Sequence, residues 1–215
     1  MVGERLYVLT SPEFDFTSPH LPPAIRYADP VLDDPTWVEH WQSPWTSDDA
    51  RPLVLVGLSS TFQNQVDVLQ RIVAALGTLP VRALVTLGPV IAEELVPGRD
   101  NVAVVRAAPH REVLTQAAAL VTHGGHGTLI KGLSAGVPVV CLPMGRDQDD
   151  AAARVVERGV GVRLKPSAPS DQIAGALRQV LDDAGYGSRA RALGQSIRDR
   201  VGCVDVIAEL EQPLA

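Results

Sequence analysis

The chain has 215 residues and a formal net charge of −6, and 46% of its residues are hydrophobic. That length suits one α/β domain with an extension, and the negative charge argues against nucleic acid as a partner. No apolar run approaches the 18 residues that a membrane span requires, and no N-terminal stretch is typical of a signal peptide, so we expect a cytoplasmic protein.

The first 50 residues contain seven of the nine aromatic side chains and many of the prolines. One strand is expected at 5–9, followed by a proline-rich extended segment. Asp34 and Pro35 are typical of a helix N-cap followed by proline at the first helical position. Such a helix would place Trp37 and Trp41 on one face. We interpret these two side chains as packing residues, with aromatic recognition of a ligand as the alternative.

The composition changes near residues 46–52, where apolar runs begin to alternate with helical periodicity. We therefore divide the chain into 1–50 and a domain at 51–215. Strand-then-helix repetition with fully apolar strands predicts an α/β fold, a Rossmann-like parallel sheet with helices on both faces. Strands are expected at 53–58, 81–87, 102–106, 118–122, 138–142 and 161–164. Helices are expected at 64–77, 90–95, 110–117, 127–136, 148–159, 170–184, 188–201 and 203–211.

The two cysteines have no metal-ligand spacing. Cys141 lies within an apolar run, which indicates a buried free thiol.

A glycine-rich turn at 122–128 follows one apolar run, and an Asp-Gln pair follows the next, at Asp147 and Gln148. Glycines allow the backbone to approach a ligand closely, and a helix that begins there directs free N–H groups at an anion. Ligands of parallel sheets bind beyond the carboxyl ends of the strands, where both loops should lie. The sequence therefore predicts a site for a phosphate-bearing ligand.

The chain resembles the nucleotide-sugar-binding half of the glycosyltransferases that decorate natural products, which include plant and bacterial UDP- and dTDP-sugar transferases. The resemblance covers residue 53 to the end and rests on five segments, at 54–61, 106–114, 122–128, 136–148 and 152–164. It implies one half of a GT-B fold, with residues 1–50 as the end of the acceptor domain and the interdomain linker. The resemblance also implies a partner, an N-terminal acceptor domain in cis or in trans.

By this resemblance, His123 contacts the donor diphosphate. Hydrogen-bond donors at that point would stabilise the charge that grows on the leaving diphosphate. Backbone amides and one hydroxyl would join it, from Gly125, His126, Gly127 and Thr128, and further hydroxyls from Ser59 and Ser60. The alternatives are a structural role for His123, a surface role for the His126 ring and helix capping by the serines.

Asp147 and Gln148 match the acidic-Gln pair that hydrogen-bonds sugar hydroxyls in this family. A carboxylate accepts from hydroxyls, while an amide both donates and accepts, and the two together suit a polyol. Helix capping by Asp147 is the alternative for that residue.

Two positions depart from the plant members of the family. Ala107 stands where they have a Trp that stacks on the base, so stacking must come from elsewhere, with Arg106 as the candidate, or be weaker. Arg106 and Ala108 are the candidate nucleoside contacts. Lys131 stands where they have a Glu that binds ribose hydroxyls, which Lys cannot accept. That change favours a dTDP-sugar over a UDP-sugar.

The resemblance implies an inverting glycosyltransferase that acts on a hydroxyl of a small hydrophobic acceptor. The resemblance implies that the catalytic base lies in the acceptor domain, so none is expected in this chain. No metal is expected, because the diphosphate loop lacks an Asp-x-Asp pair, and no cofactor is expected. Two alternatives stay open. One is a non-catalytic donor-binding subunit that pairs with a separate acceptor-binding protein, and the other is a sugar-nucleotide epimerase of the same fold.

Overall fold

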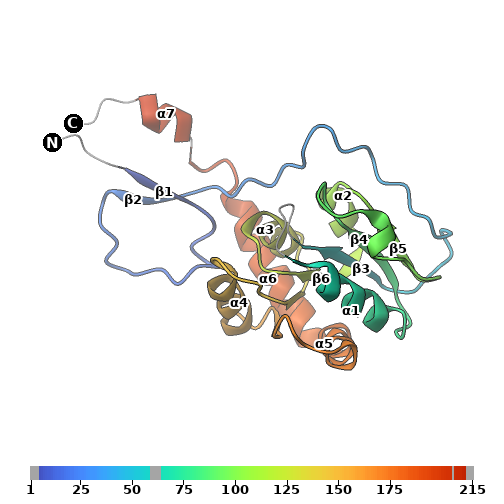
Figure 1. Cartoon of the computed structure of the whole chain (residues 1–215). Coiled ribbons are helices and arrows are strands. Elements are labelled where there is room, and N and C mark those ends of the chain that lie inside the picture. The colour runs from blue at the N-terminus through green and yellow to red at the C-terminus, as the bar shows by residue number, and fades with distance from the viewer. Residues whose placement is uncertain (1–4, 59–63, 205, 212–215) are drawn as a thin grey trace.

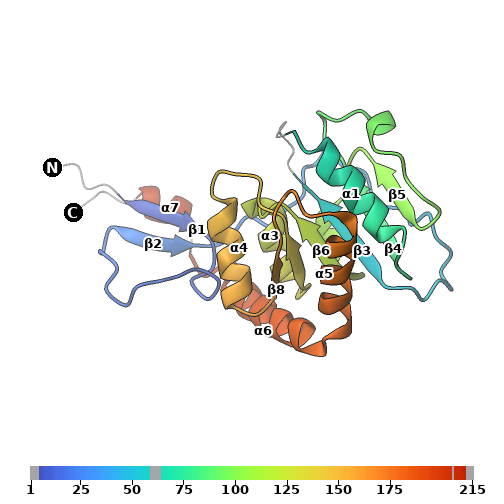
Figure 2. The ribbon, with the colours of Figure 1, turned by 60° about the horizontal axis from the view of Figure 1, so that its bottom comes forward.

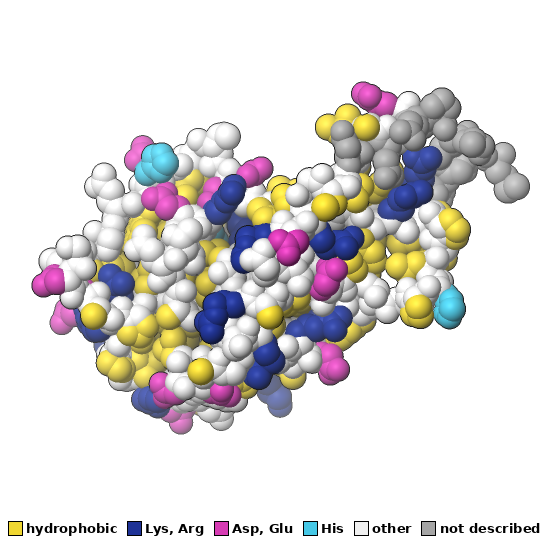
Figure 3. All heavy atoms as spheres, turned by 180° about the vertical axis from the view of Figure 1, so that it is seen from behind, with side chains coloured by type: hydrophobic (Ala, Val, Ile, Leu, Met, Phe, Trp, Pro, Cys, Tyr) yellow, Lys and Arg dark blue, Asp and Glu magenta, His cyan; other side chains and the backbone are white. Residues whose placement is uncertain are grey.

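The computed structural model describes residues 5–58, 64–204 and 206–211. Two strands near the N-terminus, β1 (Leu6–Leu9) and β2 (Ile25–Ala28), pair in parallel and form an arm that projects from the main body (Figure 1). The sequence predicted only the first of them. Figure 3 shows hydrophobic side chains on the surface of this arm, and Leu6 and Phe16 are more than half exposed.

The main body is built on a six-stranded parallel sheet in the order β5-β4-β3-β6-β7-β8. Each strand was predicted from an apolar run, and the central ones are fully buried because helices cover both faces. The strands are β3 (Leu53–Gly57), β4 (Arg82–Thr86), β5 (Val102–Val105), β6 (Ala117–Thr122), β7 (Val139–Cys141) and β8 (Gly161–Arg163). Cys141 is a buried free thiol, as predicted.

Helices cover the sheet in two layers. One face packs against α1 (Val66–Leu76) and α5 (Ser170–Asp182), which lie side by side in front of the sheet in Figure 2. The other packs against α2 (His110–Leu114), α3 (His126–Ser134), α4 (Gln148–Glu157) and α6 (Ala184–Arg200). A short 3₁₀ helix, η1 (Glu93–Leu95), precedes β5, and α7 (Val206–Glu211) lies beside the arm (Figure 1). The predicted fold class is confirmed. None of the helices among the described residues is long and apolar enough to cross a membrane.

The predicted helix after Asp34 is wrong, because the chain makes only one turn there, with Val38 N donating to the Pro35 carbonyl. The reason is that the Asp34 carboxylate does not cap its own segment. It accepts instead from Lys131 Nζ, at 2.6 Å, and from the backbone N–H of Arg111, at 2.8 Å. Long-range bonds therefore replace the local one on which the helix prediction depended.

The long helix α6 begins earlier than predicted, at Ala184 rather than 188. The first turns of this helix contain Gly185 and Gly187, although glycine disfavours a helix interior. Asp183 offsets that preference, because its side chain accepts from Gly185 N at 2.8 Å and caps the first turn.

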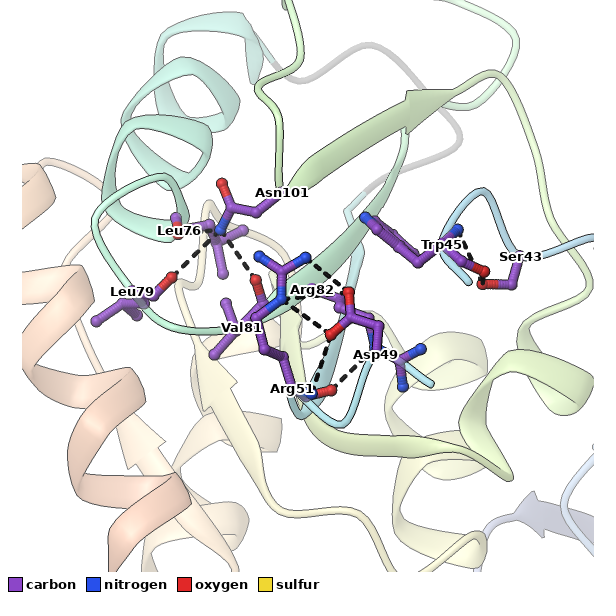
Figure 4. Close-up of polar contacts among 9 residues, drawn as sticks. All are labelled: Ser43, Trp45, Asp49, Arg51, Leu76, Leu79, Val81, Arg82 and Asn101. Atoms are coloured by element: carbon purple, nitrogen blue, oxygen red, sulfur yellow. Dashed lines mark hydrogen bonds and ion pairs between the residues drawn. The ribbon is translucent and has the colours of Figure 1, made fainter. Parts of the chain in front are cut away.

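A buried asparagine, Asn101, stabilises the end of the sheet where the strands begin, opposite the end that carries the predicted ligand loops. Asn101 is 9% exposed, and its Nδ2 donates to the carbonyls of Leu76, Leu79 and Val81, at 3.0, 3.3 and 3.0 Å (Figure 4). These bonds join the end of α1 to the start of β4. Nearby, Arg82 at the start of β4 donates to the Arg51 carbonyl, and this bond connects the linker to the same end of the sheet (Figure 4).

Asn101→Ala should destabilise the fold, because it removes three hydrogen bonds to backbone carbonyls, of which those of Leu76 and Leu79 keep one backbone donor each. The expected loss in the free energy of unfolding is on the order of 3 kcal/mol. Urea denaturation measures it. The matched control is Gln195→Ala, whose amide bonds Asp199 and Arg198 on the exposed face of α6 and should cost less than about 0.5 kcal/mol. Equal losses in the two variants would contradict the role of Asn101.

Candidate functional site

A cavity of about 490 Å³ lies at the carboxyl ends of the central strands. The strand order reverses between β3 and β6, so the connections after these strands leave toward opposite faces and open a crevice there. Residues after β3, β4, β5 and β6 line the cavity together with part of the linker: Asp34, Pro35, Trp37, Val38, Leu58, Thr86, Gly88, Pro89, Arg106, Ala107, Ala108, His110, His123, Gly125, His126, Gly127, Thr128, Lys131 and Arg146.

His123 directly follows β6 and is 7% exposed. A Cβ on Gly125 would meet the Cε1 and Nε2 atoms of the His123 ring at 2.5 Å, so only glycine admits the ring there. Burial lowers the pKa of His123, with the Asp147 carboxylate opposing this and Arg146 adding to it. The ring is therefore neutral near pH 7 and offers one N–H to the cavity or its walls.

The N-terminus of α3 opens onto the same cavity. Gly125 stands at the N-cap in an extended conformation, and no side chain caps the helix. The amides of His126, Gly127 and Thr128 belong to the first turn, where N–H groups have no partner within the helix. The His126 ring lies elsewhere, since its Nε2 donates to the Leu9 carbonyl of the arm at 2.7 Å. Only the amide of His126 is thus available to a ligand at this helix end.

The Asp-Gln pair lies next to the glycine turn but does not line the cavity. A Cβ on Gly124, at φ +91°, would meet the Gln148 carbonyl oxygen at 3.1 Å, so the two loops approach closely. Gln148 is 2% exposed, and its Oε1 accepts from Met144 N at 2.7 Å. Asp147 occupies the N-cap position of α4, yet its exposed side chain makes no capping hydrogen bond. The capping alternative for Asp147 therefore has no hydrogen bond to support it.

His110 lines the cavity together with Arg106 and Ala108. Its Nε2 lies 2.9 Å from Thr86 Oγ1, and that hydroxyl donates to the Val56 carbonyl at 3.1 Å, so the histidine N–H donates to the hydroxyl. Burial lowers the pKa of His110 to about 4, with Lys131 adding to the effect and Asp34 opposing it. His110 is consequently neutral and structural.

Lys131 does not face the cavity as a solvated lysine. Its ammonium pairs with Asp34 at 2.6 Å, and the two side chains are only 12% and 15% exposed. Sequence reasoning singled out Lys131 but missed its partner, which lies 97 positions away in the linker.

Asp34 and Arg146 also line the cavity but were not predicted as contacts, and ligand recognition by Trp37 was only the alternative to packing. Arg146 adopts φ 59°, which is uncommon for a residue with a side chain, and its position directly before Asp147 was the available signal. The predicted contacts Ser59 and Ser60 lie outside the described residues.

Acid should destabilise the protein through His110. Below pH 6.5 the unfolded chain takes up a proton that the folded His110 refuses until about pH 4, so stability is complete above this window and falls as pH decreases through it. The share lost is on the order of 3 kcal/mol. His110→Gln keeps a donor for Thr86 but does not titrate. The free energy of unfolding of this variant, measured in urea, should decrease between pH 7 and pH 4 by about 3 kcal/mol less than that of the wild type. An equal decrease in both proteins would contradict the assignment of His110.

Comparison with known proteins identifies the fold and the family. Residues 70–212 match the family described as the erythromycin biosynthesis protein CIII-like, C-terminal domain. The 4'-demethylrebeccamycin synthase of Lentzea aerocolonigenes is 31% identical over 210 residues, which make up 96% of this chain and 49% of that protein. The demethyllactenocin mycarosyltransferase of Streptomyces fradiae is 31% identical over 81% of this chain and 38% of its own.

The crystal structure of the kitacinnamycin glycotransferase superposes with a TM-score of 0.79 at 29% identity, over 99% of this chain and 55% of that one. The calicheamicin glycosyltransferase superposes with a TM-score of 0.82 at 24% identity, over 96% of this chain and 52% of that one. The chain thus spans about half the length of these relatives, or less. It belongs to the erythromycin biosynthesis protein CIII-like C-terminal domain family, and its fold is one half of the GT-B glycosyltransferase architecture.

Proposed function

We propose that this chain is the donor-binding domain of an inverting glycosyltransferase and that its cavity holds the diphosphate of a UDP- or dTDP-sugar. One observation carries the proposal. The neutral ring of His123 and the uncapped first turn of α3 meet in one cavity at the point where the strand order reverses. Helix N-termini bind phosphate through free amides and the helix dipole. The named relatives, a mycarosyltransferase and several glycosyltransferases, support the same reaction class.

Different residues of the site would bind the diphosphate, the sugar and the nucleoside of the donor. His123, the amides of Gly125, His126 and Gly127, and the amide and hydroxyl of Thr128 would hold the diphosphate. Ser59 and Ser60 stay candidate diphosphate contacts, and Asp147 and Gln148 candidate sugar contacts. Arg106 and Ala108 would face the nucleoside.

In the proposed reaction, an acceptor hydroxyl oxygen attacks the anomeric carbon, and the bond from that carbon to the diphosphate oxygen breaks. The electron pair of that bond leaves with the nucleoside diphosphate, where His123 and the α3 amides would stabilise the growing charge. A base in the acceptor domain would take the hydroxyl proton, and the acceptor would be a small hydrophobic molecule.

The exposed surface of the arm is an argument for an adjoining acceptor domain, in cis or in trans. A two-stranded sheet is marginally stable alone, and parallel sheets are normally covered on both faces, yet β1 exposes Leu6 and Leu9. We infer that residues 1–50 are the end of such a domain and the linker from it, and that residues 51–215 bind the donor.

The cavity wall near Lys131 contains an acceptor for the ribose of the nucleoside. Lysine alone favoured a deoxyribose donor, but the Asp34 carboxylate beside it is an acceptor for ribose hydroxyls. The wall therefore suits UDP as well as dTDP, and we propose either as the donor nucleotide.

His123→Ala should weaken binding of dTDP and UDP by roughly ten- to a hundred-fold, or about 1.5–3 kcal/mol, the range for a hydrogen bond to a charged group. Calorimetry in EDTA measures it. His126→Ala is the matched control, since it keeps the amide and removes a ring that bonds the arm. Unchanged affinity in His123→Ala, or a strict Mg²⁺ requirement in the wild type, would sink the proposal.

Asp147→Ala should lower affinity for the nucleotide-sugar by about ten-fold while sparing the bare nucleoside diphosphate, because Asp147 would contact sugar hydroxyls only. The melting temperature should hold, since the side chain makes no capping bond. Asp149→Ala, which loses an exposed pair with Arg163, serves as the control. Equal losses for both ligands, or a clear drop in melting temperature, would make Asp147 a structural residue.

A further inference from the structure

An exposed tryptophan, Trp37, also lines the cavity. Trp37 lines this cavity and a second one beside it, and Arg106, Ala107 and Ala108 line both as well. Ala107 offers only a methyl group, whereas Trp37, which lines the same two cavities, offers a large aromatic surface. The aromatic surface that the sequence lacks at 107 is present in the linker.

Trp37 differs from the other two tryptophans. Trp41 and Trp45 are partly buried and pack against the hydrophobic core on the face of the sheet that α2, α3, α4 and α6 cover. Trp37 is 68% exposed and belongs to neither core cluster. Packing therefore accounts for Trp41 and Trp45, and it leaves the large apolar face of Trp37 to be covered by something else.

The linker holds Trp37 in place through Asp34. The Asp34 carboxylate bonds Lys131 of α3 and the Arg111 amide at the start of α2, and Lys131 and Asp34 are both largely buried. A turn follows directly, with Val38 N donating to the Pro35 carbonyl at 3.1 Å. Trp37 lies within that turn, so its position is fixed against the two helices that frame the cavity.

We propose that Trp37 is the stacking surface for the nucleobase of the donor, with Asp34 as its positioning residue. The inference rests on the proposed function, because the diphosphate end of the ligand must lie at His123 and α3. The base would then reach the wall formed by Arg106, Ala107 and Trp37. Stacking on an aromatic side chain tolerates any base, which agrees with a site that accepts either pyrimidine nucleotide.

The experiment separates base from phosphate. Calorimetry in EDTA compares dTDP, UDP and inorganic pyrophosphate on the wild type, Trp37→Leu, Trp37→Phe and the control Phe16→Leu, an exposed aromatic on the arm. Trp37→Leu should weaken dTDP and UDP roughly five- to a hundred-fold and leave pyrophosphate within about two-fold. Trp37→Phe should restore most of the loss, and Phe16→Leu should change nothing.

Fluorescence gives a second readout. The double variant Trp41→Phe, Trp45→Phe leaves Trp37 as the remaining tryptophan of the three. Its emission should be quenched by dTDP and not by pyrophosphate.

The failures of the two proposals are distinguishable. If His123→Ala weakens dTDP but Trp37→Leu does not, or if Trp37→Leu weakens pyrophosphate equally, the Trp37 assignment is overturned and the diphosphate site stands. Trp37 would then be a contact for an acceptor or for the adjoining domain. If the wild type binds none of the three ligands, both proposals fall.

Discussion

The parallel pairing of β3 with β6 is the constraint on which the site depends. Its register sets Gly57, the last residue of β3, opposite Thr122, the last residue of β6. The sheet grows outward from this pair on both sides, so the two following loops diverge and leave space between them. A Cβ on Gly57 would meet His110 Cε1 at 2.7 Å and the Thr128 methyl at 3.1 Å. Glycine at this position therefore allows His110 and the first turn of α3 to pack closely against the end of β3.

Two further glycines bring the separate motifs together. Gly125 admits the His123 ring, and Gly124, at φ +91°, admits the Gln148 backbone. The turn after β6 and the start of α4 therefore form one packed unit, whose donors are held before any ligand arrives. Such preorganisation is what makes hydrogen bonds to a developing charge effective, because nothing needs to reorient during the reaction.

The sheet was predictable because its signal is local, whereas the linker was not. Apolar runs marked each main strand, and the glycine turn marked the start of α3. Asp34 carries the same local signal as a helix cap, but its bonds run to Lys131 and Arg111, which no spacing rule reveals. The same holds for Trp37 and Trp41, which the predicted helix placed on one face and the structure separates into an exposed and a packed side chain.

Charge at the cavity is more balanced than a count of basic residues suggests. His110 and His123 are both neutral because burial lowers their pKa values, and the Lys131 ammonium is compensated by Asp34. In the proposed function, the diphosphate would therefore be held mainly by neutral N–H donors and the α3 dipole, with Arg106 and Arg146 at the cavity wall. A ring of fixed cations would bind the nucleoside diphosphate product as strongly as the transition state and slow its release. Charge grows on the leaving oxygen during the transfer, so donors fixed beside it would interact more strongly with the transition state than with the intact donor, and that difference accelerates the reaction.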